Sequence, residues 1–148
     1  MTTQTSTGIT FEVSASTPAT FDPAGFAALS YTLVGEITTI PQSGASFTVV
    51  NHEPVATGVT EKYKGFVDYG SVALDAALDT SDAGQVIMKA GADGAEQNTK
   101  HSFKLAYQDG SIEYWYGSIY TFQENPAGAN SMVTVNMQIE LDKPKVYA

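Results

Sequence analysis

Alternating apolar and polar residues dominate the last part of the chain and predict β structure there. The longest run is Ser131–Asp142. Successive side chains of a strand point to opposite faces of its sheet, so this run predicts a strand with one buried face and one polar face. The expected buried positions are Val133, Val135, Met137, Ile139 and Leu141, and the polar positions are Thr134, Asn136, Gln138, Glu140 and Asp142.

A hairpin is predicted immediately before this strand. Residues 103–107 alternate between apolar and polar or small side chains, and Asp109-Gly110 follows them. Gly accepts the positive φ that a tight turn requires, so this dipeptide suits a turn between two strands. The returning strand, at about Ile112–Gln123, leads through the polar loop 125–130 into the final strand. Together these segments predict a three-strand antiparallel meander.

The returning strand is apolar on both sides. Tyr114, Tyr116, Tyr120 and Phe122 would share one face, and Trp115 and Ile119 the other. We therefore expect the core to cover one face and another part of the structure to cover the other. Flat aromatic rings also suit sugar stacking, with Trp115 and its Tyr neighbours as the contact surface, but aromatic residues in strands are more often core or subunit interface.

Only one helix is predicted, near residues 82–90. Thr80, Ser81 and Asp82 offer N-cap oxygens, and Gly91 is suited to a left-handed stop. The positions expected to pack inward are Ala83, Val86, Ile87 and Ala90.

The first half of the chain predicts shorter strands and one long connection. The strands are expected at Ile9–Ala15, Ser30–Ile40, Ser46–Val50 and Val72–Leu78, with a turn at Pro41–Gly44. Asn51–Gly70 has little regular pattern, and so long a loop in a compact domain is usually functional or disordered. The expected fold class is mainly β: an antiparallel β-sandwich or partial barrel with one short helix, in a single domain over residues 1–148.

Charge and composition narrow the possible functions. Sixteen acidic residues against seven basic ones give a net charge of -9, and every basic residue is Lys. Without the planar fork of Arg, and with a net charge that repels phosphate, specific DNA or RNA recognition is not expected. The chain has no Cys. No segment approaches the roughly 20 apolar residues of a membrane span, and the first residues lack the pattern of a signal peptide, so we expect a soluble protein made in a cytosol.

No arrangement of residues predicts catalysis. His52 and His101 have no nucleophile motif beside them, and exposed loop histidines are the better interpretation. Asp75, Asp79 and Asp82 would suit a metal site on one continuous helix, but the predicted strand ends and the helix begins within this segment, so helix capping is the favoured role. We expect no enzyme activity, no metal and no cofactor.

The stretch HSFKLAYQDGSIEYWYGSI, residues 101–119, followed by Ser131–Asp142, resembles the end of the major tail tube proteins of long-tailed, lambda-like bacteriophages (siphoviruses). In that family a strand, an Asn- or Asp-Gly turn, an aromatic strand bearing Gly and a long final strand follow a short helix. The earlier order of strand pair, long loop, strand and helix also matches over most of the chain.

The resemblance implies a structural role in a phage tail. Six copies would form a ring, and rings would stack into a hollow tube that encloses a tape-measure protein and later passes DNA. Tail tip and terminator proteins would be further partners, and the protein would assemble in the host cytoplasm and reside in the virion. The alternatives are a monomeric β-sandwich adhesion or carbohydrate-binding module, and the ring-forming tube protein of a bacterial secretion machine.

The resemblance also suggests where the functional surfaces lie. The segments expected to bridge one ring to the next are the N-terminal arm Met1–Gly8, the long loop Asn51–Gly70 and the C-terminal tail Lys143–Ala148. Ring-stacking candidates in the long loop are His52, Glu53, Glu61, Lys62, Lys64 and Asp68. Lumen candidates are Thr134, Asn136, Gln138 and Glu140, with Glu113 on the adjoining strand; the alternative, that this polar face meets the outside solvent, stays open.

Overall fold

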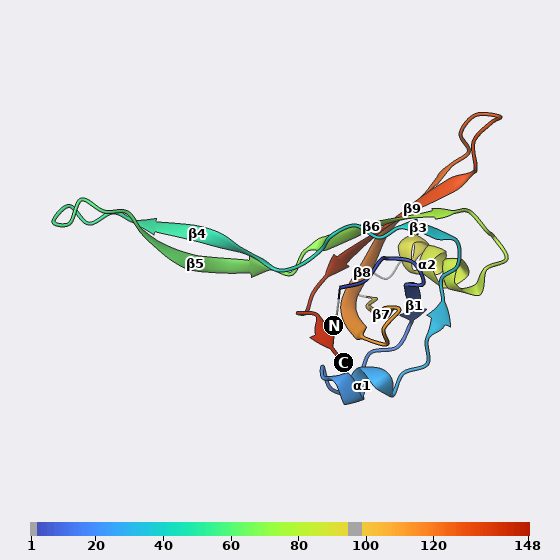
Figure 1. Cartoon of the computed structure of the whole chain (residues 1–148), viewed down its shortest axis with the longest axis horizontal. Coiled ribbons are helices and arrows are strands. Elements are labelled where there is room, and N and C mark those ends of the chain that lie inside the picture. The colour runs from blue at the N-terminus through green and yellow to red at the C-terminus, as the bar shows by residue number, and fades with distance from the viewer. Residues whose placement is uncertain (1–2, 95–98) are drawn as a thin grey trace.

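One curved antiparallel sheet forms the body of the protein in this computed structural model, which describes residues 3–94 and 99–148 (Figure 1). The strand order is β2-β1-β7-β8-β9-β6-β3, and β10 pairs with β8. The strands of this sheet are β1 (Thr10–Ser14), β2 (Thr32–Leu33), β3 (Ile37–Thr39), β6 (Ser71–Ala77), β7 (His101–Ala106), β8 (Ile112–Asn125), β9 (Thr134–Leu141) and β10 (Val146–Tyr147).

Two further parts complete the fold. The strands β4 (Ser46–His52) and β5 (Glu61–Asp68) form a separate two-stranded sheet that projects far from the body (Figure 1). The helices are α1 (Pro23–Ala27) and α2 (Ala83–Asp93). The prediction of a mainly β, antiparallel partial barrel with a short helix near residues 82–90 is confirmed.

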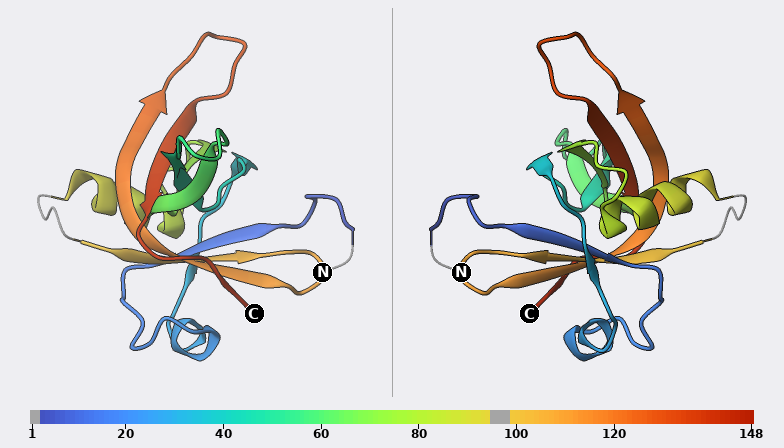
Figure 2. Two further views of the ribbon diagram at one scale, coloured as in Figure 1. Left: turned by 90° about the vertical axis from the view of Figure 1, so that its left-hand side faces the viewer. Right: turned by 90° about the vertical axis from the view of Figure 1, so that its right-hand side faces the viewer.

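The core lies inside the curve of the sheet, where α2 packs against β8 (Figure 2). The predicted alternation of the final strand is confirmed, because every second residue of β9 is buried. Across the sheet, β6 pairs with β9 over its whole length and contributes its own buried positions. The buried members of the core include Phe11, Val72, Leu74, Met88, Phe103, Trp115, Val135, Met137 and Ile139.

The long strand β8 is covered on both faces over its first half, as its apolar pattern predicted. Trp115 belongs to the main core, whereas Tyr114 and Tyr116 form a second cluster with Phe26 of α1. The rings of Phe26 and Tyr114 stack with their centroids 5.3 Å apart. The short helix α1 was not predicted, although Asp22 as N-cap and Pro23 at the first turn are an ordinary helix start.

The second half of β8 contradicts the expected grouping of its aromatic residues. The pairing with β9 shifts register between Ile119 and Thr121, which marks a β-bulge. Because the extra residue reverses the alternation, Phe122 packs against the main core and Tyr120 is 63% exposed. The prediction that Phe122 shares the face of Tyr114 and Tyr116 is therefore wrong, and nothing in the described structure covers Tyr120 as it covers those two residues.

Helix α2 begins as predicted but ends later and packs on other residues. The Asp82 carboxylate accepts a hydrogen bond from the Gln85 amide nitrogen at 3.0 Å, which confirms its capping role. Gly91 does not stop the helix, which continues to Asp93 while Gly91 lies against Ile119 and His101 of the sheet. The residues fully buried on α2 are Gly84, Gln85 and Met88, whereas Val86, expected inside, is 52% exposed.

The segment Ser30–Ile40 is two short strands rather than one. The backbone turns at Glu36, whose φ of 64° lies in the left-handed region. Before this turn β2 pairs with β1, and after it β3 pairs with β6, so the segment crosses from one edge of the sheet to the other. The residues Pro41–Gly44 consequently form no hairpin, since β4 pairs with β5 and not with β3.

The close approach of α2 to this crossing segment yields a stability prediction. A Cβ on Gly84 would lie 2.2 Å from the Leu33 carbonyl oxygen, so Gly84→Ala should lower the free energy of unfolding by about 2 kcal/mol. The intrinsic helix preference favours Ala over Gly by about 1 kcal/mol and acts in the opposite direction. Gly128→Ala, where nothing lies within 4 Å, is the matched control. Urea unfolding followed by Trp fluorescence tests this; a Gly84→Ala protein as stable as wild type contradicts it.

Candidate interaction surfaces

The segment expected to be an irregular loop, Asn51–Gly70, forms most of a long hairpin that we call the arm, residues 46–68. That expectation is wrong: β4 and β5 pair from Ser46 with Asp68 to His52 with Glu61. The alternation was hidden because neither face of the arm is uniformly polar. A register shift between Phe47 and Val49 breaks the pattern further.

The arm exposes an unusual amount of apolar surface. Val55 at its tip is 99% exposed and Phe66 is 91% exposed. A two-stranded hairpin is marginally stable alone, and large exposed apolar patches mark interaction sites. The exposed large apolar residues of the arm are Phe47, Val49, Val50, Val55, Val59, Tyr63, Phe66 and Val67. The arm is therefore the first candidate interaction surface.

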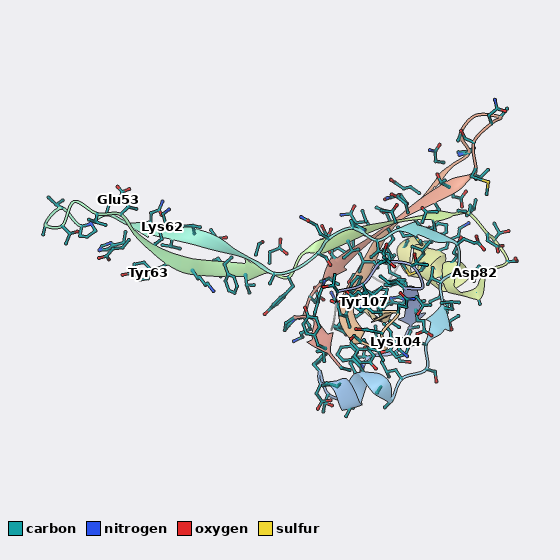
Figure 3. The ribbon with its side chains drawn as sticks, viewed as in Figure 1. Glu53, Lys62, Tyr63, Asp82, Lys104 and Tyr107 are labelled. Atoms are coloured by element: carbon teal, nitrogen blue, oxygen red, sulfur yellow. The ribbon has the colours of Figure 1, made fainter. Side chains whose placement is uncertain are left out.

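All six ring-stacking candidates lie on this arm. His52 ends β4, Glu53 follows it at the tip, and Glu61, Lys62, Lys64 and Asp68 belong to β5 (Figure 3). Among the described residues, four Lys side chains lie in ion pairs with a carboxylate, all in the body. Within the described parts of the chain, neither Lys62 nor Lys64 has a carboxylate within 4.0 Å.

The root of the arm is joined to the body by a short, closely packed connection. Strand β5 passes into β6 through Tyr69 and Gly70 alone. Gly70 has a φ of 98°, and a Cβ there would lie 2.6 Å from the Gly44 carbonyl oxygen, so only glycine fits. The Asp68 carboxylate also accepts a hydrogen bond from the Gly70 nitrogen at 2.9 Å.

Four of the lumen candidates form a second surface. Thr134, Asn136, Gln138 and Glu140 alternate with the buried residues of β9 and are all partly exposed. Asn136 donates to the Asp75 carboxylate at 2.9 Å, and Gln138 donates to Glu140 at 2.7 Å. Their neighbours across β6 and β8 are Ser71, Ala73, Asp75, Ala77, Ser118, Thr121, Gln123 and Asn125. We call this set the polar face; its charged residues are the carboxylates Asp75 and Glu140, and β6, β8 and β9 contain no Lys.

Glu113 lies apart from the other four candidates. It shares a face of β8 with Trp115, on the core side of the sheet, and is 5% exposed. The Tyr107 hydroxyl donates to its carboxylate, and the Lys145 ammonium lies 3.4 Å from it. Burial and this bond to Glu113 raise the pKa of Tyr107 above its ordinary value. Lys145 also lies 4.9 Å from the Trp115 ring centroid and donates to the Ser43 carbonyl oxygen at 3.1 Å.

The two terminal segments lie against the body. In the tail Lys143–Ala148, β10 pairs with Glu113 and Tyr114 of β8. In the N-terminal segment Met1–Gly8, Met1 and Thr2 lie outside the described residues. The Gln4 side chain accepts a hydrogen bond from the Asp109 nitrogen at 3.2 Å, next to the hairpin turn.

The described residues assemble no recognisable catalytic centre. His52 lies on the arm, whereas His101 is buried beneath α2, where desolvation lowers its pKa. The described ranges contain no group of three or more His, Cys, Asp or Glu side chains placed to hold a metal ion. Asp79 accepts hydrogen bonds from Ser81 at the turn before α2, which fits the local capping role. No helix in the described chain is long and apolar enough to cross a bilayer.

The aromatic residues that suggested sugar stacking do not form an exposed platform. Trp115 is 2% exposed, Tyr114 4% and Tyr116 8%. Only Tyr120 of this group is open to solvent. The expected contact surface of a carbohydrate-binding module is therefore absent from this strand.

Comparison with known proteins finds similarity in structure alone. No protein-family model and no curated protein matches the sequence. A chain in the anti-feeding prophage baseplate has a TM-score of 0.67 at 9% identity, covering 100% of this chain and 97% of that one. A chain in the tail of an empty GTA particle with C6 symmetry has a TM-score of 0.67 at 11% identity, covering 99% of each chain.

A third similar chain comes from an extracellular contractile injection system, in a structure of the PVC sheath/tube terminator. Its TM-score is 0.67 at 7% identity, with 100% of this chain and 98% of that chain covered. At such identities the comparison establishes the fold. The whole chain, arm included, shares the architecture of chains found in phage-like tail and injection assemblies.

The buried pair of Lys145 and Glu113 gives a second stability prediction. Their side chains are 14% and 7% exposed, so Lys145→Met leaves a buried carboxylate without its cation and should cost about 3 kcal/mol. The control Lys89→Met breaks the pair with Glu124, whose side chains are 53% and 44% exposed, and should cost less than about 1 kcal/mol. If urea unfolding shows that both variants lose the same free energy of unfolding, the prediction that burial makes the Lys145–Glu113 pair more costly to break is contradicted.

Proposed function

We propose that this chain is the structural subunit of a tail tube, in which copies form rings and the rings stack into a hollow tube. The observation that carries the proposal is the arm, which exposes eight large apolar side chains that the described parts of the chain leave uncovered. A large exposed apolar surface marks a site where another molecule binds. In the proposed tube that molecule is a second copy of the chain, whose binding is favoured by mass action as the protein concentration rises. The full-length similarity to a chain of a tail with C6 symmetry supports six copies in each ring.

In this assembly the arm carries the contacts between rings. Its six candidate residues, His52, Glu53, Glu61, Lys62, Lys64 and Asp68, supply charge and hydrogen bonds around the apolar positions. The terminal segments Met1–Gly8 and Lys143–Ala148 contribute to the same contacts. The work is structural rather than enzymatic.

The polar face of β6, β8 and β9 lines the lumen in this proposal. A surface whose charged groups are the carboxylates Asp75 and Glu140 releases no counterions from DNA and so gives DNA nothing to bind. Thr134, Asn136 and Gln138 keep the same surface hydrated. Glu113 is not part of it, since its carboxylate is bound to Lys145 and Tyr107 on the other side of the sheet.

The partners follow from this role. The tube encloses a tape-measure protein, ends at tail tip and terminator proteins, and passes DNA without specific recognition. The protein assembles in the host cytoplasm and resides in the tail of a virion, of the long-tailed phage type. The tube of a contractile injection system is the second candidate, because one similar structure is a sheath/tube terminator; a sheath around purified particles would identify it.

Negative-stain electron microscopy of the purified full chain tests the assembly. We expect rings or hollow filaments that become more abundant with protein concentration, because apolar contacts between arms obey mass action. Deleting the exposed tip, residues 53–60, should abolish stacking while leaving a folded body. Uniform monomers at every concentration, in the presence of purified tail tips, would contradict the proposal.

Charge reversal on the polar face tests the lumen assignment. In assembled tubes, Glu140→Lys should add cations along the DNA path and slow DNA delivery, and the effect should weaken as salt rises. Glu124→Lys makes the same charge change at a residue that pairs with Lys89 of α2 and should leave delivery unchanged. Normal delivery by Glu140→Lys particles, together with a tube map that places residue 140 outside the lumen, would refute the assignment.

A further inference from the structure

The two faces of the arm carry opposite charges. Residues directly opposite in an antiparallel pair share a face, so Val49 lies beside Lys64, and Val50 lies beside Tyr63 on the other face. We call one face basic, with Phe47, Val49, Asn51, Lys62, Lys64 and Val67, and the other acidic, with Ser46, Thr48, Val50, His52, Glu61, Tyr63 and Asp68. Figure 3 shows Lys62 and Tyr63 on opposite sides of the ribbon.

The faces remain distinct across the register shift near the root. The Lys64 ammonium lies 4.6 Å from the centroid of the Phe47 ring, which keeps these two residues on one side. On the other side, a Cβ on Gly65 would lie 3.0 Å from the Val50 side chain. The division into a basic and an acidic face therefore holds over the length of β4 and β5.

Both faces also expose apolar side chains. On the basic face Phe47 is 47% and Val49 61% exposed, and on the acidic face Val50 is 49% and Tyr63 56% exposed. A ribbon that lies on a single partner needs apolar residues on one face only, as in a sheet with one solvated side. Apolar residues on both faces require cover on both faces.

The charges are complementary and have no partner of opposite sign within the described arm. Lys62 and Lys64 have no carboxylate within 4.0 Å in the described structure, and the acidic face bears no Lys. On that face Glu61 accepts a hydrogen bond from the Tyr63 hydroxyl at 3.0 Å. A second copy of the same ribbon supplies what each face lacks: carboxylates for the lysines, and lysines for the carboxylates.

We infer that arms of neighbouring copies stack face to face, the basic face of one on the acidic face of the next. The inference rests on the proposed self-assembly and specifies its contact. Packed sheets lie about 10 Å apart, a spacing close to the Debye length of about 8 Å at physiological salt, so the opposed charges are only partly screened. Because the two faces differ, the contact is heterologous, and a heterologous contact that does not close on itself can repeat from copy to copy, as a stack of rings requires.

Two charge-reversed variants test this contact by complementation. Lys62→Glu/Lys64→Glu makes both faces of the arm acidic, and His52→Lys/Glu61→Lys makes both faces net basic while leaving the Asp68 bond to Gly70 intact. Each variant alone should need about tenfold more protein to assemble, because like faces repel. A 1:1 mixture should assemble as wild type does, since alternating copies restore an opposite charge at every contact.

Sedimentation velocity and electron microscopy of the full-length proteins give the readout. The control Lys89→Glu/Lys100→Glu makes the same net charge change as Lys62→Glu/Lys64→Glu, but on the body, and should assemble as wild type. Wild-type assembly should also weaken at about 1 M salt, where the Debye length falls to about 3 Å. Retained near-ultraviolet circular dichroism of Trp115 shows that each variant is folded.

The outcomes separate the inference from the proposed function. If wild type forms rings but the single variants assemble normally, or the mixture stays unassembled, arm-to-arm stacking is overturned while the tube proposal stands. A failed mixture with impaired single variants places the arm against the body of a second copy instead. If wild type forms no ring at any concentration, both the contact and the tube proposal fail.

Discussion

The buried side chain of Gln85 joins the three parts of the body on which the rest of the structure depends. Its amide group donates to the carbonyl oxygens of Gly35 and Ala77 and accepts from the Asp79 nitrogen, at 3.1, 2.9 and 3.0 Å. The neighbouring cap Asp82 adds a bond from the Gly35 nitrogen at 3.1 Å. A buried amide with these bonds is expensive to disrupt, so α2, the crossing segment and the end of β6 are held in one arrangement. That arrangement joins both edges of the sheet to the helix, because the crossing segment runs from β2 at one edge to β3 at the other.

The sequence predicts the elements whose residues see one environment along their length. The alternation in β6 and β9 locates both strands, and Asp109-Gly110 locates the turn between β7 and β8. Prediction from the sequence pattern fails where the environment of the side chains changes within one strand or helix. The bulge in β8 reverses its faces, so Phe122 enters the core. On α2, the polar residue Gln85 is buried because its amide group donates to the backbone carbonyl oxygens of Gly35 and Ala77.

The candidate surfaces follow the same logic. The polar residues of β9 were predictable because they alternate regularly with apolar ones and their partners in β6 and β8 are polar or small. The arm was not predictable from the sequence, because apolar residues on both faces match neither a half-buried strand nor a loop. No described part of the chain covers these residues. Glu113 resembles an exposed acid in the sequence, and only the fold brings Lys145 and Tyr107 to it.

The uninterrupted passage from β5 through Tyr69 and Gly70 into β6 has a mechanical consequence. Gly70 fits tightly against Gly44, so this junction has little room to yield. A pull on an arm held by another copy is transmitted along the backbone into β6, which pairs with β9 along its whole length. The load then acts parallel to the strands and is shared by the interstrand bonds together, rather than opening them one after another. In a tube under tension, force would run from one subunit to the next through the wall itself.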